Sequence, residues 1–103
     1  MTHRLLVQYG RPTDPAEFDR YYRDVHTPLA LTLPGLRSLS VGRPSSLDGS
    51  DAPYLVAMLD FESAEAMGTA LQSPEGGTTA ADLPNFASGG VSLSHFAVEE
   101  AAG

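Results

Sequence analysis

Residues 54–61, YLVAMLDF, are the stretch from which the fold can be worked out. Every residue in it except Asp60 is apolar or aromatic. A short and nearly continuous apolar run is typical of a strand whose two faces are both covered. Side chains alternate along a strand, and here both sets are apolar: Leu55, Ala57, Leu59 and Phe61 on one face, and Tyr54, Val56 and Met58 on the other. We therefore expect a strand over 54–61.

The segments on either side of this strand predict two similar units. Before it, residues 3–10 alternate as a strand, a helix begins at Asp14-Pro15, and 36–42 predict a second strand. After it, Ser63 caps a helix over 64–72, and 91–98 predict the last strand. The helix over 64–72 is expected to face inward with Ala66, Met67, Ala70 and Leu71.

Strand–helix–strand occurring twice is the order of the ferredoxin-like, split βαβ fold. We therefore predict an α+β protein with a four-stranded antiparallel sheet and two main helices on one face. Residues 1–103 provide length for a single domain.

The first helix combines an apolar stripe with a proline that interrupts it. The stripe consists of Phe18, Tyr21, Tyr22, Val25 and Leu29. Pro28 has no amide hydrogen, its ring crowds the carbonyl four residues earlier, and it pushes the preceding Thr27 away from helical angles. We expect a kink or break between Val25 and Pro28.

Two segments are predicted to be loops. Residues 43–53 are rich in turn-forming residues and predict an exposed hairpin-type loop. Residues 74–90, PEGGTTAADLPNFASGG, predict irregular backbone with at most one helical turn before Pro84. Connections of this length are often functional or mobile.

The sheet predicts self-association. Two helices cover only one face, yet 54–61 is apolar on both faces and Leu6 lies opposite Leu5 and Val7. A large exposed apolar face is an association surface, and each Å² buried contributes about 25 cal/mol. We expect a homodimer formed sheet face to sheet face.

Composition argues against several classes of partner and cofactor. Six basic and 13 acidic residues give a net charge of −7, which disfavours nucleic acid and anionic membranes as partners. Without cysteine there is no disulfide scaffold, thiolate metal site or cysteine nucleophile. No glycine-rich phosphate loop is present, so we expect no nucleotide cofactor. The first ten residues lack the apolar stretch of a signal peptide, so we expect a soluble cytoplasmic protein.

Three stretches resemble the EthD family: FDRYYRDVHTPLALTLPGL (18–36), PYLVAMLDFESAEAMGTALQSPEG (53–76) and ADLPNFASGGV (81–91). The most specific features are the tyrosine-rich helix ending in His-x-Pro-Leu, the Ser-Pro-Glu-Gly turn, and Asp82 with Asn85-Phe86. The resemblance implies a dimeric α+β barrel. Similar folds include lactone isomerases, polyketide cyclases, and oxygenases that are cofactor-free or use haem, with ligands held between helix and sheet.

His26 is the first candidate for a catalytic residue. It lies four residues after Tyr22, beside the expected break at Pro28, and an ordinary histidine pKa of about 6.5 suits proton transfer. The alternative is a packed histidine bonded to a backbone carbonyl that Pro28 frees. Asp82 either orients His26 or caps a turn.

The other candidates are substrate-binding residues: Tyr22, Asp82, Asn85, Phe86 and Tyr9. Asn85 could instead satisfy backbone amides after Pro84, Phe86 could plug the space under a loop, and the tyrosines could be core residues. His3 and His95 lie on strands that could pair, but without a placed carboxylate we predict no metal site.

The sequence is compatible with two main functions and with a third, less favoured one. The first is a small cofactor-independent enzyme, in which His26 moves a proton during isomerisation, cyclisation or reaction with oxygen. Its substrate would be a small apolar or aromatic metabolite in a pocket between sheet and helices. The alternative is a non-catalytic dimer that binds a hydrophobic metabolite or escorts a partner enzyme. A third option is haem chemistry with His26 or His95 as axial ligand.

Overall fold

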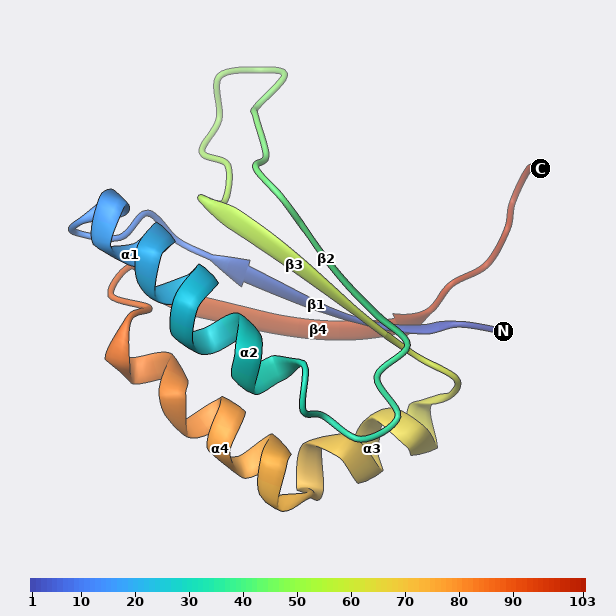
Figure 1. Ribbon diagram of the computed structural model, residues 1–103. Helices are drawn as coiled ribbons and strands as arrows, with labels where there is room; N and C mark the ends of the chain where they lie inside the picture. The colour runs from blue at the N-terminus through green and yellow to red at the C-terminus, as the bar shows by residue number, and fades with distance from the viewer.

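The protein is built around a four-stranded antiparallel sheet with the strand order β2–β3–β1–β4. The structure, a computed structural model, describes residues 1–103. The strands are β1 (His3–Tyr9), β2 (Ser38–Gly42), β3 (Leu55–Phe61) and β4 (Val91–Ala97). All helices lie on one side of the sheet (Figure 1). The predicted ferredoxin-like α+β class is therefore confirmed. The sheet is open, with β2 and β4 as its edges.

The core lies between the sheet and the helices. Strand β3 is central, and its buried residues alternate as predicted, from Leu55 to Phe61. On β1, Leu5, Val7 and Tyr9 are buried and pair with Leu59, Ala57 and Leu55 of β3. This register gives the sheet one continuous apolar face toward the helices.

The first helix is continuous from α1 (Pro15–Tyr21) through η1 (Tyr22–His26) to α2 (Thr27–Ala30). The Asp14 side chain caps it by accepting a hydrogen bond from the Glu17 amide, as the spacing predicts. Of the predicted kink or break, the break is not present, because η1 is a π-helical turn in which the Thr27 amide donates to the Tyr22 carbonyl. Thr27 keeps helical angles (φ −58°, ψ −46°), contrary to the prediction. The wider turn gives the ring of Pro28 room without breaking the helix.

The π-helical turn also changes which residues face the sheet. The buried residues of this helix are spaced four apart: Phe18, Tyr22, His26 and Ala30. In a regular helix such a series drifts around the axis, because a turn takes 3.6 residues. A turn that takes up an extra residue offsets this drift. His26 therefore lies on the buried face and not at the edge of the predicted stripe.

Residues 74–90 are more regular than predicted. Helix α3 (Ala64–Gln72) is followed at once by α4 (Pro74–Asp82) and by the short 3₁₀ helix η2 (Leu83–Asn85). The Ser73 side chain caps α4 by accepting from the Gly76 amide at 3.1 Å. The prediction of irregular backbone is wrong here, and α4 adds a further helix to the layer that covers the sheet (Figure 1). Leu71, expected to face inward, is 39% exposed.

Glycine makes the junction between these two helices possible. A Cβ atom at Gly76 would lie 2.4 Å from the carbonyl oxygens of Ala70 and Leu71. Only a residue without a side chain lets the first turn of α4 approach the last turn of α3 this closely. The predicted Ser-Pro-Glu-Gly turn is thus a helix start combined with a close helix contact.

The uncovered face of the sheet is mixed and not uniformly apolar as predicted. Leu6, Val56 and Met58 are half-buried there, and Phe96 is 44% exposed. Arg4 and Asp60 form an ion pair at 2.8 Å across the same face. Serines on the edge strands complete it: Ser38, Ser40, Ser92 and Ser94.

The loop over 43–53 is mostly exposed, as predicted. It extends away from the sheet between β2 and β3 (Figure 1). No helix of the structure has both the length and the apolar character needed to cross a bilayer.

Candidate functional site

A buried histidine–aspartate pair lies between the helices. Nδ1 of His26 is 3.0 Å from Oδ2 of Asp82, and the two residues are only 5% and 7% exposed. His26 comes from the π-helical turn η1 and Asp82 from the last residue of α4. The imidazole therefore bonds to a carboxylate and not to a backbone carbonyl freed by Pro28.

Two further side chains hold the Asp82 carboxylate. The Tyr21 hydroxyl donates to Oδ1 at 2.5 Å, and the Asn85 amide donates to the same oxygen at 3.0 Å. Burial by itself raises the pKa of Asp82, but the hydrogen bonds from Tyr21, Asn85 and His26 outweigh it, so this pKa lies below its ordinary value. Asp82 is consequently ionised at neutral pH.

The ionised carboxylate determines the tautomer of neutral His26. A carboxylate can only accept hydrogen bonds, so the proton of the neutral imidazole must sit on Nδ1. Nε2 then carries a lone pair and no hydrogen. A carboxylate on the far side of the ring also stabilises the imidazolium that forms when Nε2 takes a proton. The arrangement is that of a general base with a positioning residue behind it.

His26, whose Nε2 has no hydrogen-bond partner within the chain, lies beside an apolar cavity between the sheet and the helices. The cavity measures about 70 Å³, and His26 lies in its wall. Its walls are mostly aliphatic and include Leu5, Val7, Ala57, Leu59, Leu33 and Leu83. The exposed side chains Leu71 (39%) and Leu93 (55%) also belong to the lining. Apolar surroundings with few polar groups are typical of small-molecule sites.

Two tyrosines share this cavity with His26. Tyr9 is 2% exposed and Tyr22 is 8% exposed, with their ring centroids 5.7 Å apart. Burial raises the pKa of Tyr22 to about 12 and raises that of Tyr9 as well. Both hydroxyls therefore remain protonated at neutral pH and can donate hydrogen bonds.

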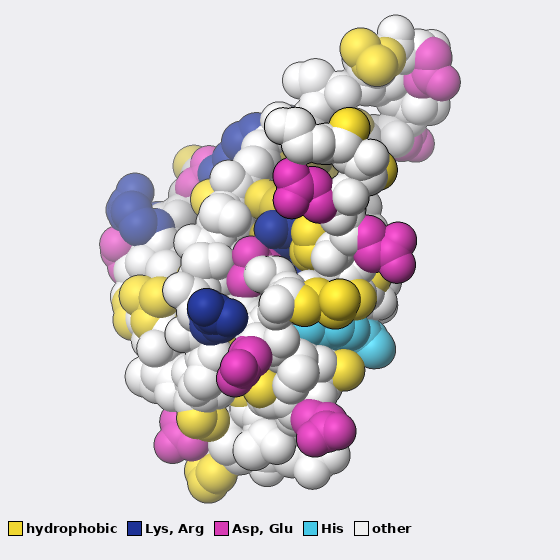
Figure 2. Space-filling model, turned by 90° about the vertical axis from the view of Figure 1, so that its right-hand side faces the viewer, with side chains coloured by type: hydrophobic (Ala, Val, Ile, Leu, Met, Phe, Trp, Pro, Cys, Tyr) yellow, Lys and Arg dark blue, Asp and Glu magenta, His cyan; other side chains and the backbone are white.

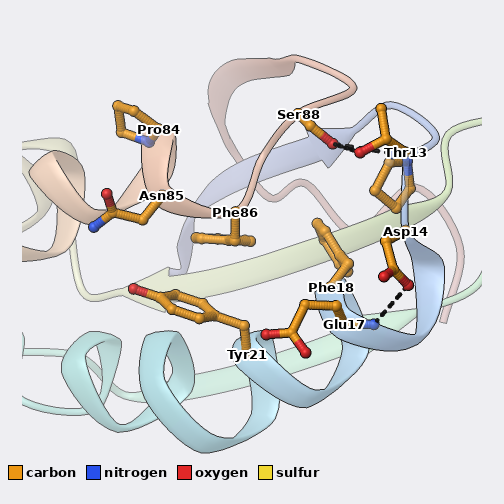
Figure 3. A pocket seen from close by; sticks show the side chains of 10 residues that line it. Thr13, Asp14, Glu17, Phe18, Tyr21, Pro84, Asn85, Phe86 and Ser88 are labelled. Carbon is orange, nitrogen blue, oxygen red and sulfur yellow. Dashed lines mark hydrogen bonds between the residues drawn. The ribbon is translucent and has the colours of Figure 1, made fainter.

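Phe86 packs against two residues of the cavity wall and lines a separate hollow on the surface. Its ring lies 4.6 Å from the His26 ring and 5.6 Å from the Tyr9 ring, centroid to centroid. The hollow measures about 180 Å³, and Glu17, Phe18 and Tyr21 also line it (Figure 3). The hydrogen bond between Thr13 and Ser88 joins the loops at the rim of this hollow.

The other two histidines form a pair away from this site. Nε2 of His3 and Nδ1 of His95 are 2.9 Å apart, so pairing of β1 with β4 does bring them together. Exposed histidine lies beside hydrophobic side chains at the end of the molecule that carries both termini (Figure 2). No group of three or more potential metal-ligating side chains is present.

The comparisons with known proteins identify the family. A family model described as the EthD domain matches residues 10–90. The chain belongs to the EthD family. The match includes His26, Asp82 and the α3–α4 junction, while Tyr9 lies one residue before it.

Two relatives match most of the chain. One is an uncharacterized 11.0 kDa protein in the thcB-thcC intergenic region of Rhodococcus erythropolis, 44% identical over 88% of this chain and 89% of that protein. The other is the crystal structure of an EthD family protein from Bacillus halodurans. It has 29% sequence identity and a TM-score of 0.89, and the match covers 96% of this chain and 100% of that chain.

More distant structures share the fold of this EthD protein. They include hydroxynitrile lyase from Passiflora edulis (TM-score 0.76, 16% identity, 99% and 97% of the two chains). A further match is SnoaB, a cofactor-independent oxygenase from Streptomyces nogalater, with a TM-score of 0.69 and 18% identity. The match covers 96% of this chain and 94% of that chain. A dimeric ferredoxin-like protein from Thermobifida fusca also matches, with a TM-score of 0.71 and 13% identity. The match covers 95% of this chain and 92% of that chain.

The EthD fold brings the predicted site residues into one region, and their roles remain predictions. His26, Tyr22 and Tyr9 line the cavity, and Asp82 and Asn85 lie behind His26. Phe86 packs against His26 and is not itself part of the lining. Asn85 contacts Asp82 rather than the cavity.

Sequence reasoning missed two parts of the site. Tyr21 was predicted as part of the apolar stripe of the first helix, but its hydroxyl is bonded to Asp82. The cavity lining from α4 was missed because that segment was predicted to be irregular: Gly76, Thr79 and Ala80. Ser73 followed by Pro74 is the signal that could have revealed α4.

Proposed function

We propose that this EthD protein is a small-molecule enzyme that uses proton transfer, without a cofactor, on a small apolar or aromatic compound. The observation that carries the proposal is the buried bond between His26 Nδ1 and Asp82, 3.0 Å long, in a histidine that lines the cavity and whose Nε2 is unpaired. His26 is the catalytic residue, because its Nε2 is the atom that meets the ligand. Asp82 is a positioning residue that acts through His26.

The chemistry needs only groups that the chain supplies. Nε2 of His26 takes a proton from a bound molecule, and Asp82 stabilises the resulting imidazolium. The apolar wall keeps water away, which strengthens the interaction between the two charges. The same proton can then be returned to another atom of the molecule, which is the pattern of an isomerase or cyclase.

Structures with the same fold support chemistry of this type. SnoaB is a cofactor-independent oxygenase, and the Passiflora edulis protein is a lyase. Neither likeness exceeds 25% identity, so the argument for this chain rests on the His26–Asp82 geometry.

Deuterium exchange tests the proposal without knowledge of the natural substrate. A panel of small ketones and phenols is incubated in D₂O with the protein, and loss of C–H signals is followed by NMR. We expect exchange of at least one compound by the unmodified protein and a loss of at least about 100-fold in His26→Gln, consistent with removal of a general base. Circular dichroism must show that the variant remains folded.

Two results would contradict an enzymatic role. One is full exchange activity in folded His26→Gln. The other is saturable binding of panel compounds, seen as a rise in melting temperature, with every compound recovered unchanged. The second result would instead favour the alternative, a non-catalytic binding protein.

We further propose that the protein is a homodimer that packs through the uncovered face of its sheet. Phe96 is exposed on this face, Leu6, Val56 and Met58 lie beside it, and a protein of similar fold is dimeric. Light scattering should give twice the chain mass of 10.9 kDa. Met58→Glu should give the single mass, because it places a charge within the contact.

The matched control for the dimer is Leu47→Glu. Leu47 is fully exposed in the loop between β2 and β3, so this variant should remain dimeric. A monomeric unmodified protein, or a dimeric Met58→Glu, would refute the proposed contact.

A further inference from the structure

Three polar groups of the cavity wall have no hydrogen-bond partner within the chain: the Tyr9 hydroxyl, the Tyr22 hydroxyl and Nε2 of His26. Thr79, the other hydroxyl of the wall, donates to backbone carbonyls of Glu75 and Leu29. No fully buried side-chain oxygen or nitrogen lacks a partner. The three unpaired atoms must therefore contact open space.

Tyr9 borders the cavity and also a shallow hollow lined by Gln8, Gly10, Pro53 and Ser92. The residue is 2% exposed. Its side chain lies on the helix side of the sheet, whereas those of Gln8 and Ser92 lie on the uncovered face, so its hydroxyl belongs to the cavity. Tyr22 is less clearly assigned, because it lines both the cavity and an open hollow beside Arg43. The Tyr9 hydroxyl is thus the polar group that an occupant of the cavity would meet in addition to His26.

Tyr9 and His26 both pack against the ring of Phe86. The centroid separations from this ring are 5.6 Å for Tyr9 and 4.6 Å for His26. Burial raises the pKa of Tyr9, and its nearness to Tyr22 and to the Asp82 carboxylate raises it further. Tyr9 is consequently a hydrogen-bond donor within electrostatic reach of the His26–Asp82 pair.

We propose that the cavity binds a small carbonyl compound, whose oxygen accepts a hydrogen bond from Tyr9 and whose α-carbon faces His26. This inference rests on the proposed function and names its substrate class. A donor and a base in an apolar wall suit such a molecule, because its oxygen only accepts and its α C–H bond is acidified by the carbonyl. A hydrocarbon would leave the Tyr9 hydroxyl unpaired, which is unfavourable in a buried site.

The reaction that this geometry supports is enolisation. Nε2 of His26 removes the α-proton, and the electrons of the C–H bond form a carbon–carbon double bond. The π electrons of the carbonyl move to its oxygen, where the Tyr9 hydroxyl stabilises the negative charge. The proton on His26 then returns to a carbon of the same molecule, so no oxidant or reductant is required.

The cavity volume limits the substrate to a small compound. An apolar cavity of about 150 Å³ holds a benzene molecule, and this one measures about 70 Å³. Even a small ring requires side chains to move, and Leu71 and Leu93 are exposed and can change rotamer. Cyclopentanone is therefore a suitable probe.

The test compares cyclopentanone with methylenecyclopentane, which has the same shape without the oxygen. Dissociation constants are measured by NMR titration for the unmodified protein, Tyr9→Phe and the control Tyr54→Phe. The Tyr54 hydroxyl donates to Asp19 outside the cavity. We expect the unmodified protein and the control to prefer the ketone by about 3- to 10-fold, the contribution of one hydrogen bond. Tyr9→Phe should lose this preference and keep its affinity for the hydrocarbon.

Equal preference in Tyr9→Phe and the unmodified protein would overturn the inference, as would failure of the unmodified protein to bind either probe at millimolar concentration. The exchange assay separates this inference from the proposed function. Exchange that needs His26 but is unchanged in Tyr9→Phe would refute only the substrate class. A Tyr9-dependent ketone preference without exchange of any compound would refute only the enzymatic role.

Discussion

Replacing Asp82 tests the site most directly, because one carboxylate accepts three hydrogen bonds. In Asp82→Ala the donors from Tyr21, Asn85 and His26 all lose their acceptor. Asn85 is exposed and Tyr21 is half-buried, so both can turn to water, but His26 is 5% exposed and cannot. Leaving the buried Nδ1–H without an acceptor costs about 1–3 kcal/mol, and loss of the hydrogen bonds from Tyr21 and Asn85 to a charged group adds to it. We expect a loss of at least that size in the free energy of unfolding.

Asp82→Asn is the milder change and affects the base rather than the packing. Its oxygen can still accept from Tyr21 and Asn85, while its amide faces Nδ1 of His26. Exchanging charged for neutral hydrogen bonds costs about 1–3 kcal/mol. Because an amide donates, Nδ1 must become the acceptor and the proton must move to Nε2. Nitrogen-15 NMR should therefore show the opposite tautomer of His26, and the exchange activity should be lost.

The pH dependence gives a second, independent check. The pKa of Asp82 is lowered in the folded protein. Its stabilisation is therefore complete above the ordinary carboxyl pKa of about 3.9 and is lost as the pH falls through the lower native value. The stability difference between the unmodified protein and Asp82→Asn should be constant near pH 7 and shrink below about pH 4.

Urea unfolding followed by circular dichroism measures these differences, at equal protein concentration because a dimer gains stability with concentration. Asp51→Asn is the control, since Asp51 is exposed in the loop between β2 and β3. The reasoning would be refuted by an Asp82→Asn variant that matches the unmodified protein in stability at pH 7. Retention of the Nδ1–H tautomer in that variant would refute it as well.

Two further predictions concern the packing around the site. Gly76→Ala should destabilise the protein by about 1–3 kcal/mol, because its Cβ would lie 2.4 Å from the carbonyls of Ala70 and Leu71. Gly77→Ala has open space around its Cβ and should be neutral or stabilising by up to about 1 kcal/mol; equal melting temperatures for the two variants would contradict this. Phe86→Ala removes a buried ring that contacts five others and should cost about 3–5 kcal/mol in urea unfolding, whereas a loss below about 1 kcal/mol would show that Phe86 is not part of the core.

Strands and helix starts could be predicted because their signals are local. The alternation in 54–61 predicts β3 to within one residue, and Asp14 and Ser63 cap helices as expected. Helix α4 was missed because Gly76, Gly77 and the threonines after them are poor helix formers. Its stability depends on contacts with other helices, such as the hydrogen bond from Thr79 to the Leu29 carbonyl.

The sequence by itself determined which groups are available: one histidine beside a proline in a tyrosine-rich helix, an aspartate with Asn-Phe close behind it, and no cysteine. It did not determine that His26 and Asp82, 56 residues apart, would share a hydrogen bond. That contact needs the extra residue of the π-helical turn, which rotates His26 inward, and the full length of α4, which ends at Asp82. Both depend on packing between segments distant in the chain, and local propensity contains no information about such contacts.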